Sequence, residues 1–363
     1  MTSLRPTSID EVQAAVQMAG RLLPHGARTK PALTAVADEV QWLDMRGLTG
    51  VVEYAPEEFT FTALAGTPLR DIDAMLAQRG QYLPFDPPLV REGATLGGTV
   101  AAGLSGSGQK RFGGVRDFAI GVRLVDGTGQ LIRGGGKVVK NAAGFDLPKL
   151  MVGSQGRLGA IVELTFKVFP LPEAWRTVRI NCRNLHDALA VMAALNRQPL
   201  ELDALDLHPP ATLVARVAGN AASIDAHARR VAAIADRPCE MPSVDDADGW
   251  WQAQRSLKWL PPSHRLIKLA TTPRQVPVIE ASLSSPDSPR CYAVAGNVLW
   301  LAWPETEPWP GVREVGVGLT LLGSSHPGDA APPPDPAAVF AQRIKHALDP
   351  QQRFPDLRPT HAP

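Results

Sequence analysis

Residues Gly93 to Pro170 read GATLGGTVAAGLSGSGQKRFGGVRDFAIGVRLVDGTGQLIRGGGKVVKNAAGFDLPKLMVGSQGRLGAIVELTFKVFP, and this stretch decides the fold. Its glycines are dense and evenly spread, whereas its bulky residues come in short bursts typical of strands. The segment Gly97–Gly103 has almost no side-chain volume. Such a backbone can bring its N–H groups close to a ligand, and consecutive N–H groups in tight turns form a concave site for phosphate. The stretch predicts either an anion-binding loop or a glycine-rich structural corner.

Neither of the two common nucleotide-binding motifs fits this stretch. A P-loop needs Lys directly after the second glycine of G-x-x-x-x-G, but Gln109 follows Gly108 and Lys110 comes one position late. The dinucleotide motif G-x-G-x-x-G begins at Gly106 but has Arg111 in place of its third glycine. The stretch is therefore not a standard ATP or NAD loop.

The length and composition favour a soluble protein of two domains. The chain has 363 residues, of which 44% are hydrophobic and 20% charged, enough for a normal core. The net charge of +1 provides no large field for nucleic acid or an anionic membrane. Asp10 and Glu11 stand where a signal peptide would be apolar, and the apolar run Val294–Trp303 is far shorter than the ~20 residues of a membrane span. We expect a cytoplasmic protein, with peripheral attachment to the inner membrane only through partners.

The cysteines argue against a metal centre. Cys182, Cys239 and Cys291 are isolated from each other, and the sequence contains no C-x-x-C. Structural zinc sites and cysteine-ligated iron–sulfur clusters use closely spaced cysteines, so we expect neither, and no metal ligands are assigned. The odd, scattered count suits a reducing compartment.

Helix and strand signals alternate in the first half. Ser8, followed three residues later by Glu11, is a capping box that predicts a helix. Pro68 to Gly80 predicts a second helix, with Pro in its first turn and Gly at its end. A third helix should begin at 95–101, and 148–152 should be a helical turn. Strands are expected at 22–24, 40–44, 50–54, 60–65, 120–125, 129–133 and 160–169.

Four motifs in a fixed order resemble the vanillyl-alcohol-oxidase family, whose FAD-binding domains are of the PCMH type. They are Gly97–Ala101, Arg116-Asp117, Lys140–Leu147 (KNAAGFDL) and Gly153–Ile161 (GSQGRLGAI). The similarity covers roughly residues 1–172. The segment 349–354 also resembles the closing D-P-x-x-R-F of such proteins, although the family's following Asn-Pro-Gly-Arg is replaced by the residues PDLR at 355–358. Within the family, the chain resembles the FAD-binding E subunits of bacterial glycolate oxidases.

The resemblance implies an α+β fold of two domains with FAD as the cofactor. Residues 1–172 would be the PCMH-type FAD-binding domain, with subdomains of about 1–55 and 56–172. Residues 173–330 would be a smaller α+β cap, and residues 331–363 would return to the FAD-binding domain. The first loop, His25–Lys30, and the second, Thr95–Ser105, would wrap the FAD pyrophosphate with backbone amides, and the Gly156–Ile161 strand edge would contact adenine or ribose. The implied cofactor residues are His25, Gly26, Ala27, Arg28, Thr29, Lys30, Thr95, Leu96, Gly97, Gly98, Thr99, Val100, Ser105, Arg116, Asp117, Gly156, Gly159 and Ile161.

Some of these residues have a second interpretation. Arg116 and Asp117 either fix the geometry of the loop or form a structural ion pair. Lys140, Asn141 and Asp146 either contact the ligand or cap turns. In relatives that bind flavin covalently, a histidine stands near the end of the first loop. Here Arg28 or Thr29 holds that place, so we expect FAD to be bound non-covalently.

The second half predicts the cap. Strands are expected at 175–182, 213–217, 266–270 and 298–302, helices at 185–195 and 223–235, and a last helix at 336–348. Strands that alternate with two helices suggest a ferredoxin-like sheet. Trp250, Trp251 and Trp259 fall in a segment that reads as irregular. We interpret them as core of the cap; a wall facing the isoalloxazine and a docking surface for a subunit are the alternatives.

The expected substrate is a small 2-hydroxy acid, but its catalytic residues are not identified. Relatives that oxidise such acids supply a base from an H-x-G-D-G-N motif in the cap, and this chain has none. In place of that motif, the best candidate for a polar substrate site is the set Arg255, Lys258, His264, Arg265 and Lys268. We interpret these residues as solvated surface charge.

The resemblance implies an FAD-dependent oxidoreductase acting on CH–OH donors. The chain would be the FAD-binding subunit of a glycolate-oxidase-like or dehydrogenase-like complex that converts glycolate to glyoxylate, with a catalytic flavin subunit and an iron–sulfur subunit as partners. Two alternatives remain. One is a stand-alone FAD-dependent dehydrogenase of the D-lactate type, and the other is a scaffold subunit that has lost its flavin.

Overall fold

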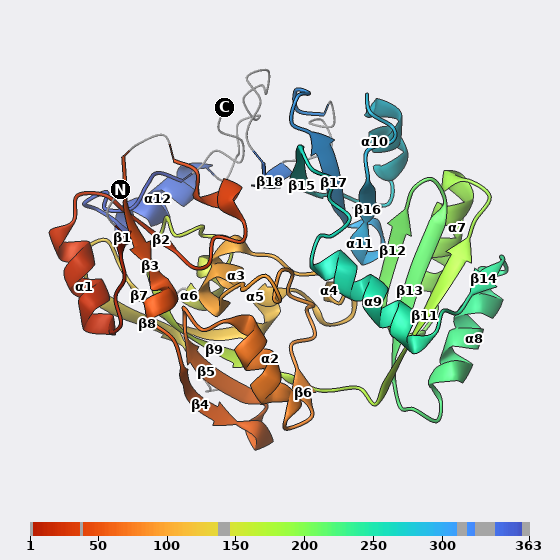
Figure 1. The fold of residues 1–363 in the computed structure, drawn as a ribbon, viewed down its shortest axis with the longest axis horizontal. Helices are drawn as coiled ribbons and strands as arrows, with labels where there is room; N and C mark the ends of the chain where they lie inside the picture. The colour runs from red at the N-terminus through yellow and green to blue at the C-terminus, as the bar shows by residue number, and fades with distance from the viewer. Residues whose placement is uncertain (1–2, 37–38, 137–145, 311–317, 324–337, 358–363) are drawn as a thin grey trace. The chain divides into compact units, whose positions relative to one another are not determined.

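The structure is a computed structural model that describes residues 3–36, 39–136, 146–310, 318–323 and 338–357 (Figure 1). The chain divides into two compact units. The first holds the described residues of Met1–Ser105, Gly114–Leu171 and Pro333–Arg358, and the second holds those of Gly106–Gly113 and Pro172–Pro332. The short segment Gly106–Gly113 therefore belongs to the second unit, although it lies within the glycine-rich stretch.

The described residues of the first unit form three sheets. A parallel sheet has the order β1-β3-β2, and an antiparallel sheet has the order β4-β5-β9-β7-β8. The third is the pair of β6 and β10. The strands are β1 (Ser3–Leu4), β2 (Leu22–His25), β3 (Gln41–Asp44), β4 (Val51–Ala55), β5 (Thr60–Leu64), β6 (Gln81–Tyr82), β7 (Ala119–Val125), β8 (Leu131–Gly135), β9 (Ala160–Lys167) and β10 (Phe169–Pro170). All seven strands predicted for this half are confirmed.

The helices of the first unit follow their capping signals. Ser8 Oγ accepts the Glu11 N–H at 3.2 Å, and the predicted helix runs from Ile9 to Met18. Glu11 reaches back to the Thr7 N–H at 2.7 Å, one residue before the position of a standard capping box. The helices are α1 (Ile9–Met18), α2 (Leu69–Ala77), α3 (Leu96–Ala102), α5 (Val115–Phe118), α6 (Leu147–Met151) and α12 (Ala338–Leu348), with 3₁₀ turns at Pro31–Thr34, Met45–Gly47 and Pro56–Glu58.

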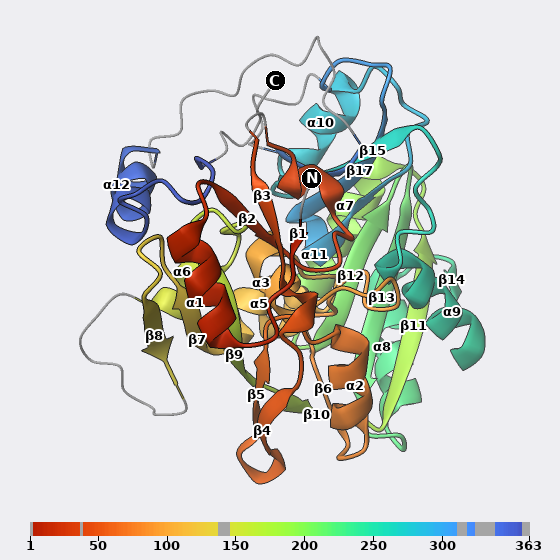
Figure 2. The ribbon, with the colours of Figure 1, turned by 60° about the vertical axis from the view of Figure 1, so that its left-hand side comes forward.

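The segment that follows α12 packs on the first unit beside its N-terminal strands (Figure 2). The Leu22 N–H donates to the Arg353 carbonyl at 2.7 Å, and Phe354 is fully buried in the same core cluster as Val12 and Val16. The Lys345 Nζ donates to Asp349 at 2.5 Å and to two backbone carbonyls. The D-P-x-x-R-F segment thus forms part of the core of this unit.

The second unit is built on one antiparallel sheet of order β14-β11-β13-β12-β16-β17-β15-β18. Its first half runs β-α-β-β-α-β along the chain, which is the ferredoxin-like order expected from the sequence. The second half adds four strands through the pairing of β12 with β16. The elements are α4 (Gln109–Phe112), β11 (Ala174–Asn181), α7 (Leu185–Asn196), β12 (Leu202–His208), β13 (Thr212–Gly219), α8 (Ile224–Ala235), β14 (Cys239–Glu240), α9 (Val244–Arg255), β15 (His264–Ala270), α10 (Val276–Ser282), β16 (Arg290–Tyr292), α11 (Ala293–Gly296), β17 (Val298–Pro304) and β18 (Gly318–Leu322).

Helices cover both faces of this sheet. Residues of α7, α8 and α10 pack with one set of alternate strand residues, whereas α9 packs through Trp251 on Ala204 and Val214 of the other face (Figure 1). Trp250 and Trp251 are therefore helical, and the prediction of an irregular segment there is wrong. The first turn of α9 is acidic, so the hydrophobic periodicity that would predict a helix is weak there. Trp251 is 3% exposed, as the core interpretation requires.

The interpretation of Arg265 as solvated surface charge is also wrong. Arg265 lies on β15, is fully buried and donates to the Glu307 carbonyl at 2.6 Å. Lys268, on the same strand, is half-buried, and burial lowers the pKa of its ammonium group. Lys258 is exposed, as expected.

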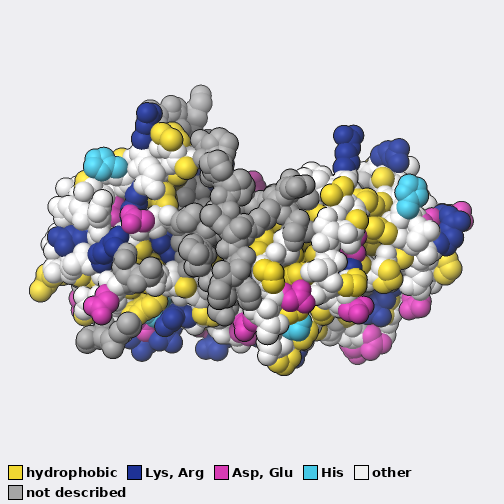
Figure 3. All heavy atoms as spheres, turned by 90° about the horizontal axis from the view of Figure 1, so that it is seen from above, with side chains coloured by type: hydrophobic (Ala, Val, Ile, Leu, Met, Phe, Trp, Pro, Cys, Tyr) yellow, Lys and Arg dark blue, Asp and Glu magenta, His cyan; other side chains and the backbone are white. Residues whose placement is uncertain are grey.

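The surface of the described residues carries both signs of charge. On the face in Figure 3, basic and acidic side chains are interspersed, in keeping with the net charge of +1. Among the helices that the structure describes, none combines the length and apolar character needed to cross a membrane.

Candidate functional site

A cavity within the first unit collects residues from the end of β2, the start of α3 and the loop into β9. Most of the residues predicted to bind the cofactor line it, which brings together parts of the chain more than 100 positions apart. Those predicted residues are His25, Gly26, Ala27, Arg28, Thr29, Lys30, Thr95, Gly97, Gly98, Gly156, Gly159 and Ile161.

The loop Gly26–Lys30 supplies unused backbone donors. None of its five N–H groups donates to an acceptor among the described residues. Arg28 has φ +53°, a left-handed conformation that tightens the turn. Its guanidinium lies over the Trp42 ring at 4.4 Å from the centroid. Consecutive N–H groups presented by such a turn form an anion-binding concavity.

Lys30 is a buried cation without a carboxylate partner among the described residues. It is 7% exposed, and its Nζ donates only to Thr29 Oγ1, at 3.0 Å. Burial lowers the pKa of its ammonium group to about 8. A buried charge is costly unless a counter-charge compensates it. Lys30 therefore indicates that an anionic ligand belongs in this cavity.

The start of α3 plays a different role from the one expected. Thr95 caps the helix and accepts the Gly98 N–H at 3.2 Å. The N–H groups of Leu96 and Gly97 donate to carbonyls of the chain before α2, at 2.9 and 2.8 Å. These three amides are satisfied within the protein, so the expectation that they are free to bind pyrophosphate is not met. The first loop, which was predicted to bind the pyrophosphate as well, keeps its amides unused.

Gly26 holds the two predicted loops together. A Cβ atom at Gly26 would collide with Thr95 Oγ1, so only glycine permits this approach. On the far side, Gly156 has φ +73° and lies against the Pro24 carbonyl, which brings the loop before β9 onto the end of β2. The dense glycines thus serve close backbone packing as well as ligand access.

Gln155 offers a buried acceptor at the same cavity. Its Oε1 atom has no hydrogen-bond partner among the described residues, although the side chain lines the cavity. A buried unsatisfied acceptor favours a ligand that carries a donor, such as a hydroxyl or an amino group. Gln155 was missed by sequence reasoning because attention in the Gly153–Ile161 motif went to the glycines on either side of it.

The other predicted residues lie outside the cavity lining. Leu96 and Val100 are fully buried in the core, and Thr99 is 2% exposed on the same helix. Ser105 Oγ accepts the Val115 N–H at 2.8 Å. For these residues the structure shows contacts within the protein, and their role with the cofactor stays a prediction.

Arg116 and Asp117 are engaged in local structure. Arg116 donates to the Lys149 carbonyl at 2.7 Å, and Asp117 accepts the Gly114 N–H at 2.9 Å at the start of α5. This agrees with the loop-fixing interpretation of the pair. Asp146 accepts the Lys149 N–H at 3.3 Å at the start of α6. Lys140 and Asn141 lie outside the described residues.

Besides Gln155, the cavity is also lined by residues that were not among the predicted cofactor residues, and of these only Ala101 belongs to a quoted motif. They supply the apolar walls and one hydroxyl, and they are Pro24, Leu33, Thr34, Met45, Ala65, Ala101 and Ala102. Their small or apolar side chains are indistinguishable from core residues in the sequence. Only the strand and helix ends that they occupy place them at the cavity.

Residues 3–135 match the FAD binding domain family. These residues are an FAD-binding domain. Its cavity fits the cofactor, because the unused amides of the first loop and the unpaired Lys30 suit a diphosphate, and Gln155 suits a nucleoside donor. The assignment of FAD and of the PCMH-type fold, made from four short motifs, is thereby confirmed.

The chain is similar to several flavoproteins over about half of its length. It is 41% identical over 197 residues to the glycolate oxidase subunit GlcE of Escherichia coli, covering 54% of this chain and 56% of GlcE. It is 30% identical over 206 residues to a D-2-hydroxyglutarate dehydrogenase of Xanthomonas citri, covering 55% and 43% of the two chains. It is 32% identical over 159 residues to the glycolate oxidase subunit GlcD of Bacillus subtilis, covering 43% and 34%. The chain thus matches about a third to just over half of the length of these relatives.

A solved structure supports the fold of the whole chain. An alkyldihydroxyacetonephosphate synthase has a TM-score of 0.70 at 16% identity, covering 97% of this chain and 75% of that protein. At this identity the similarity concerns the fold alone.

Proposed function

We propose that this chain is the FAD-binding subunit of a complex that oxidises a small 2-hydroxy acid, with glycolate to glyoxylate as the reaction. The observation that carries the proposal is the 41% identity to GlcE over 197 residues of the chain. The similarity to GlcD, also named as a glycolate oxidase subunit, supports a complex with a catalytic flavin partner.

The first unit would hold FAD without a covalent bond. The N–H groups of the loop Gly26–Lys30 and the Lys30 ammonium would neutralise the diphosphate, while Gln155 would accept a hydrogen bond from the nucleoside. The His25 ring is already bound through Nδ1 to the Gly26 carbonyl at 2.7 Å and stands before the turn. When bound, FAD supplies the electron-accepting isoalloxazine.

Electrons would leave through partners. The sequence has no closely spaced cysteines for an iron–sulfur cluster, so that centre would belong to another subunit. Residues 173–330 would act as the cap and residues 331–363 as the segment that closes the FAD-binding domain. We place the complex in the cytoplasm, at the inner membrane only through its partners.

Expression with and without the neighbouring genes tests this proposal. FAD content and glycolate-dependent dye reduction are measured for the isolated chain and for the co-purified complex. A yellow chain that releases FAD on denaturation, but reduces dye with glycolate only in the complex, is the expected result. Bleaching of the isolated flavin by glycolate or D-lactate would favour the stand-alone dehydrogenase. A colourless chain that still joins the complex would favour the scaffold.

A further inference from the structure

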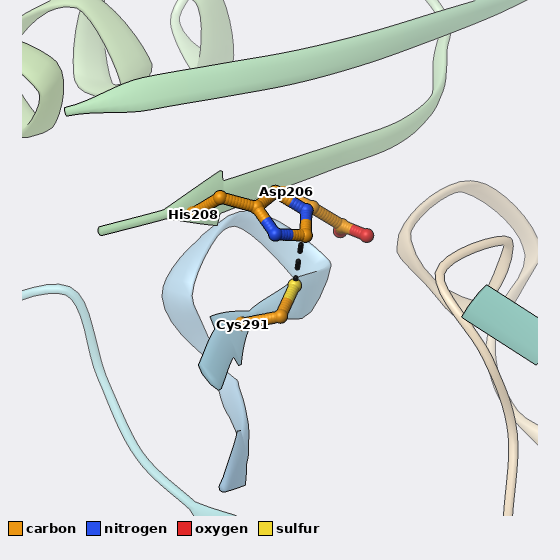
Figure 4. Close-up of side chains that lie close together, drawn as sticks. All are labelled: Asp206, His208 and Cys291. Atoms are coloured by element: carbon orange, nitrogen blue, oxygen red, sulfur yellow. Dashed lines mark hydrogen bonds between the residues drawn. The ribbon is translucent and has the colours of Figure 1, made fainter. Parts of the chain in front are cut away.

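Three potential metal ligands of different chemistry meet in the second unit, in a part of the sheet unrelated to the FAD cavity. Asp206, His208 and Cys291 each offer one ligand atom, and these atoms lie within 4.8 Å of one another (Figure 4). Asp206 and Cys291 are buried, and His208 is half-buried.

The strand register brings these residues together. Leu207 of β12 pairs with Tyr292 of β16 in the antiparallel ladder, so His208 and Cys291 are neighbours across it. Asp206 lies two residues before His208 and therefore on the same face of β12. This is the face on which α9 packs. The cluster is thus positioned by backbone pairing rather than by loops.

The spacing of the sulfur and the nitrogen suits a metal ion between them. Cys291 Sγ lies 3.5 Å from His208 Nε2. Zinc bonds of about 2.3 Å to sulfur and about 2.0–2.1 Å to nitrogen, at a tetrahedral angle, place those two atoms about 3.5 Å apart. An ion could therefore enter this pair without movement of the backbone.

Outer contacts hold two of the ligands in place. The Asp206 carboxylate accepts the Val294 N–H at 3.1 Å and the hydroxyl of Ser107. The His208 ring meets the Trp250 ring edge-on, with centroids 5.3 Å apart. The hydrogen bonds of Asp206 are of the kind that orients a metal-binding carboxylate, and the Trp250 ring limits the movement of the His208 ring.

The charges and the access also fit a divalent ion. A thiolate and a carboxylate around a doubly charged ion give a neutral site, which burial favours. A histidine binds a metal through a ring nitrogen of its neutral imidazole, and here His208 Nε2 is the atom that faces Cys291 Sγ. The thiol proton of Cys291 would be released to solvent as the sulfur–metal bond forms. His208 and Cys291 both line an open cavity of about 850 Å³, which gives the ion a path and leaves a coordination position for water.

We propose that Asp206, His208 and Cys291 bind a divalent transition-metal ion of the zinc class. Sulfur and imidazole ligands select such ions against Mg²⁺ and Ca²⁺, which prefer oxygen. The expectation from the sequence that the chain holds no metal relied on ligands close together along the chain. Here the cysteine and the histidine are 83 residues apart and meet only in the sheet.

Cobalt titration of the full flavin-loaded chain tests the proposal. Co²⁺ in a site of this type gives visible d–d bands at wavelengths beyond the flavin absorption, and Zn²⁺ should abolish them at one equivalent. Metal analysis after dialysis should find about one zinc per chain. Absence of the bands in the wild-type protein at millimolar Co²⁺ would overturn the proposal whatever the variants do.

Matched variants identify the ligands. Cys291→Ser and His208→Gln should each weaken Co²⁺ binding by more than the roughly 10–100-fold effect of outer-sphere changes. Cys182→Ser is the control, because Cys182 lines the same cavity but is not part of the cluster. Circular dichroism confirms that each variant is folded. Unchanged bands in folded Cys291→Ser protein would show that the Cys291–His208 contact is only a hydrogen bond.

Discussion

Replacing Lys30 by methionine should weaken FAD binding and stabilise the flavin-free protein at the same time. Methionine keeps the unbranched chain but removes the ammonium group. Because burial lowers the Lys30 pKa from 10.5 to about 8, the charged form costs the flavin-free fold about 3 kcal/mol at pH 7. The Lys30→Met variant should recover most of this free energy of unfolding.

The same change should reduce the affinity for FAD. A hydrogen bond between a buried ammonium and a phosphate oxygen contributes about 1.5–3 kcal/mol. Its loss corresponds to a dissociation constant about 10–100-fold higher. FAD binding is measured by quenching of flavin fluorescence, and stability by urea unfolding of the stripped protein. The control is Lys258→Met, since Lys258 is exposed and distant in sequence from the cavity.

The pH dependence of the stability distinguishes the cost of the buried charge from a simple change in packing. Between pH 8 and 10.5 the unfolded lysine binds more protons than the folded one, so the stability of the flavin-free wild type should rise with pH in this window. The advantage of Lys30→Met should be constant below pH 8 and vanish near pH 10.5. A Lys30→Met protein that is no more stable than wild type at pH 7, or that binds FAD equally well, would refute the role given to Lys30.

Two further changes follow from the same unit. Gly26→Ala should raise the Kd for FAD about 5- to 150-fold, because the added Cβ collides with Thr95 and overpacking costs about 1–3 kcal/mol. Gly20→Ala, with nothing near its Cβ, should leave the Kd measured by flavin fluorescence unchanged. Retained affinity in Gly26→Ala would mean that the two loops need not touch. Lys345→Met should lower the free energy of unfolding, measured with urea, by about 3–5 kcal/mol, because the buried Asp349 carboxylate (1% exposed) loses its cation. The double variant Lys345→Met with Asp349→Leu should recover part of that loss, because it removes the unpaired carboxylate as well. A loss as large in the double variant would point to the carbonyl contacts of Lys345 rather than to the ion pair.

Elements with local signals were predictable from the sequence, and pairing over long distances was not. Ser8 and Pro68 predict the starts of α1 and α2, because capping and proline effects act within one turn of a helix. The strand β12 was missed because it is buried on both faces and so does not alternate. The helix α9 was missed because its buried residues are few and its first turn is acidic.

The candidate site shows the same division. The glycines and Lys30 were found because a glycine-rich turn with a nearby cation is a local pattern that the sequence displays, but which amides remain unused depends on acceptors elsewhere. The carbonyls of Ala65 and Thr67 take the first amides of α3, and no sequence pattern near Gly97 reports this. Of the two loops predicted to wrap the diphosphate, the turn between Gly26 and Lys30 is therefore the better candidate, because its N–H groups meet no acceptor among the described residues.

The position of Lys30 also explains why a turn without a nucleotide motif can serve this cofactor. In a P-loop, the lysine follows the glycines and opens a helix, so amides and cation come from one continuous segment. Here Gly26 closes against Thr95 and supplies the narrow turn, while Lys30 enters the same cavity four residues later, just before the 3₁₀ turn Pro31–Thr34. Pro31 has no N–H, so the run of unused amides ends there and the lysine stands at its edge. Amides and cation would thus meet one anion of the predicted cofactor, although their spacing matches no helix-based motif.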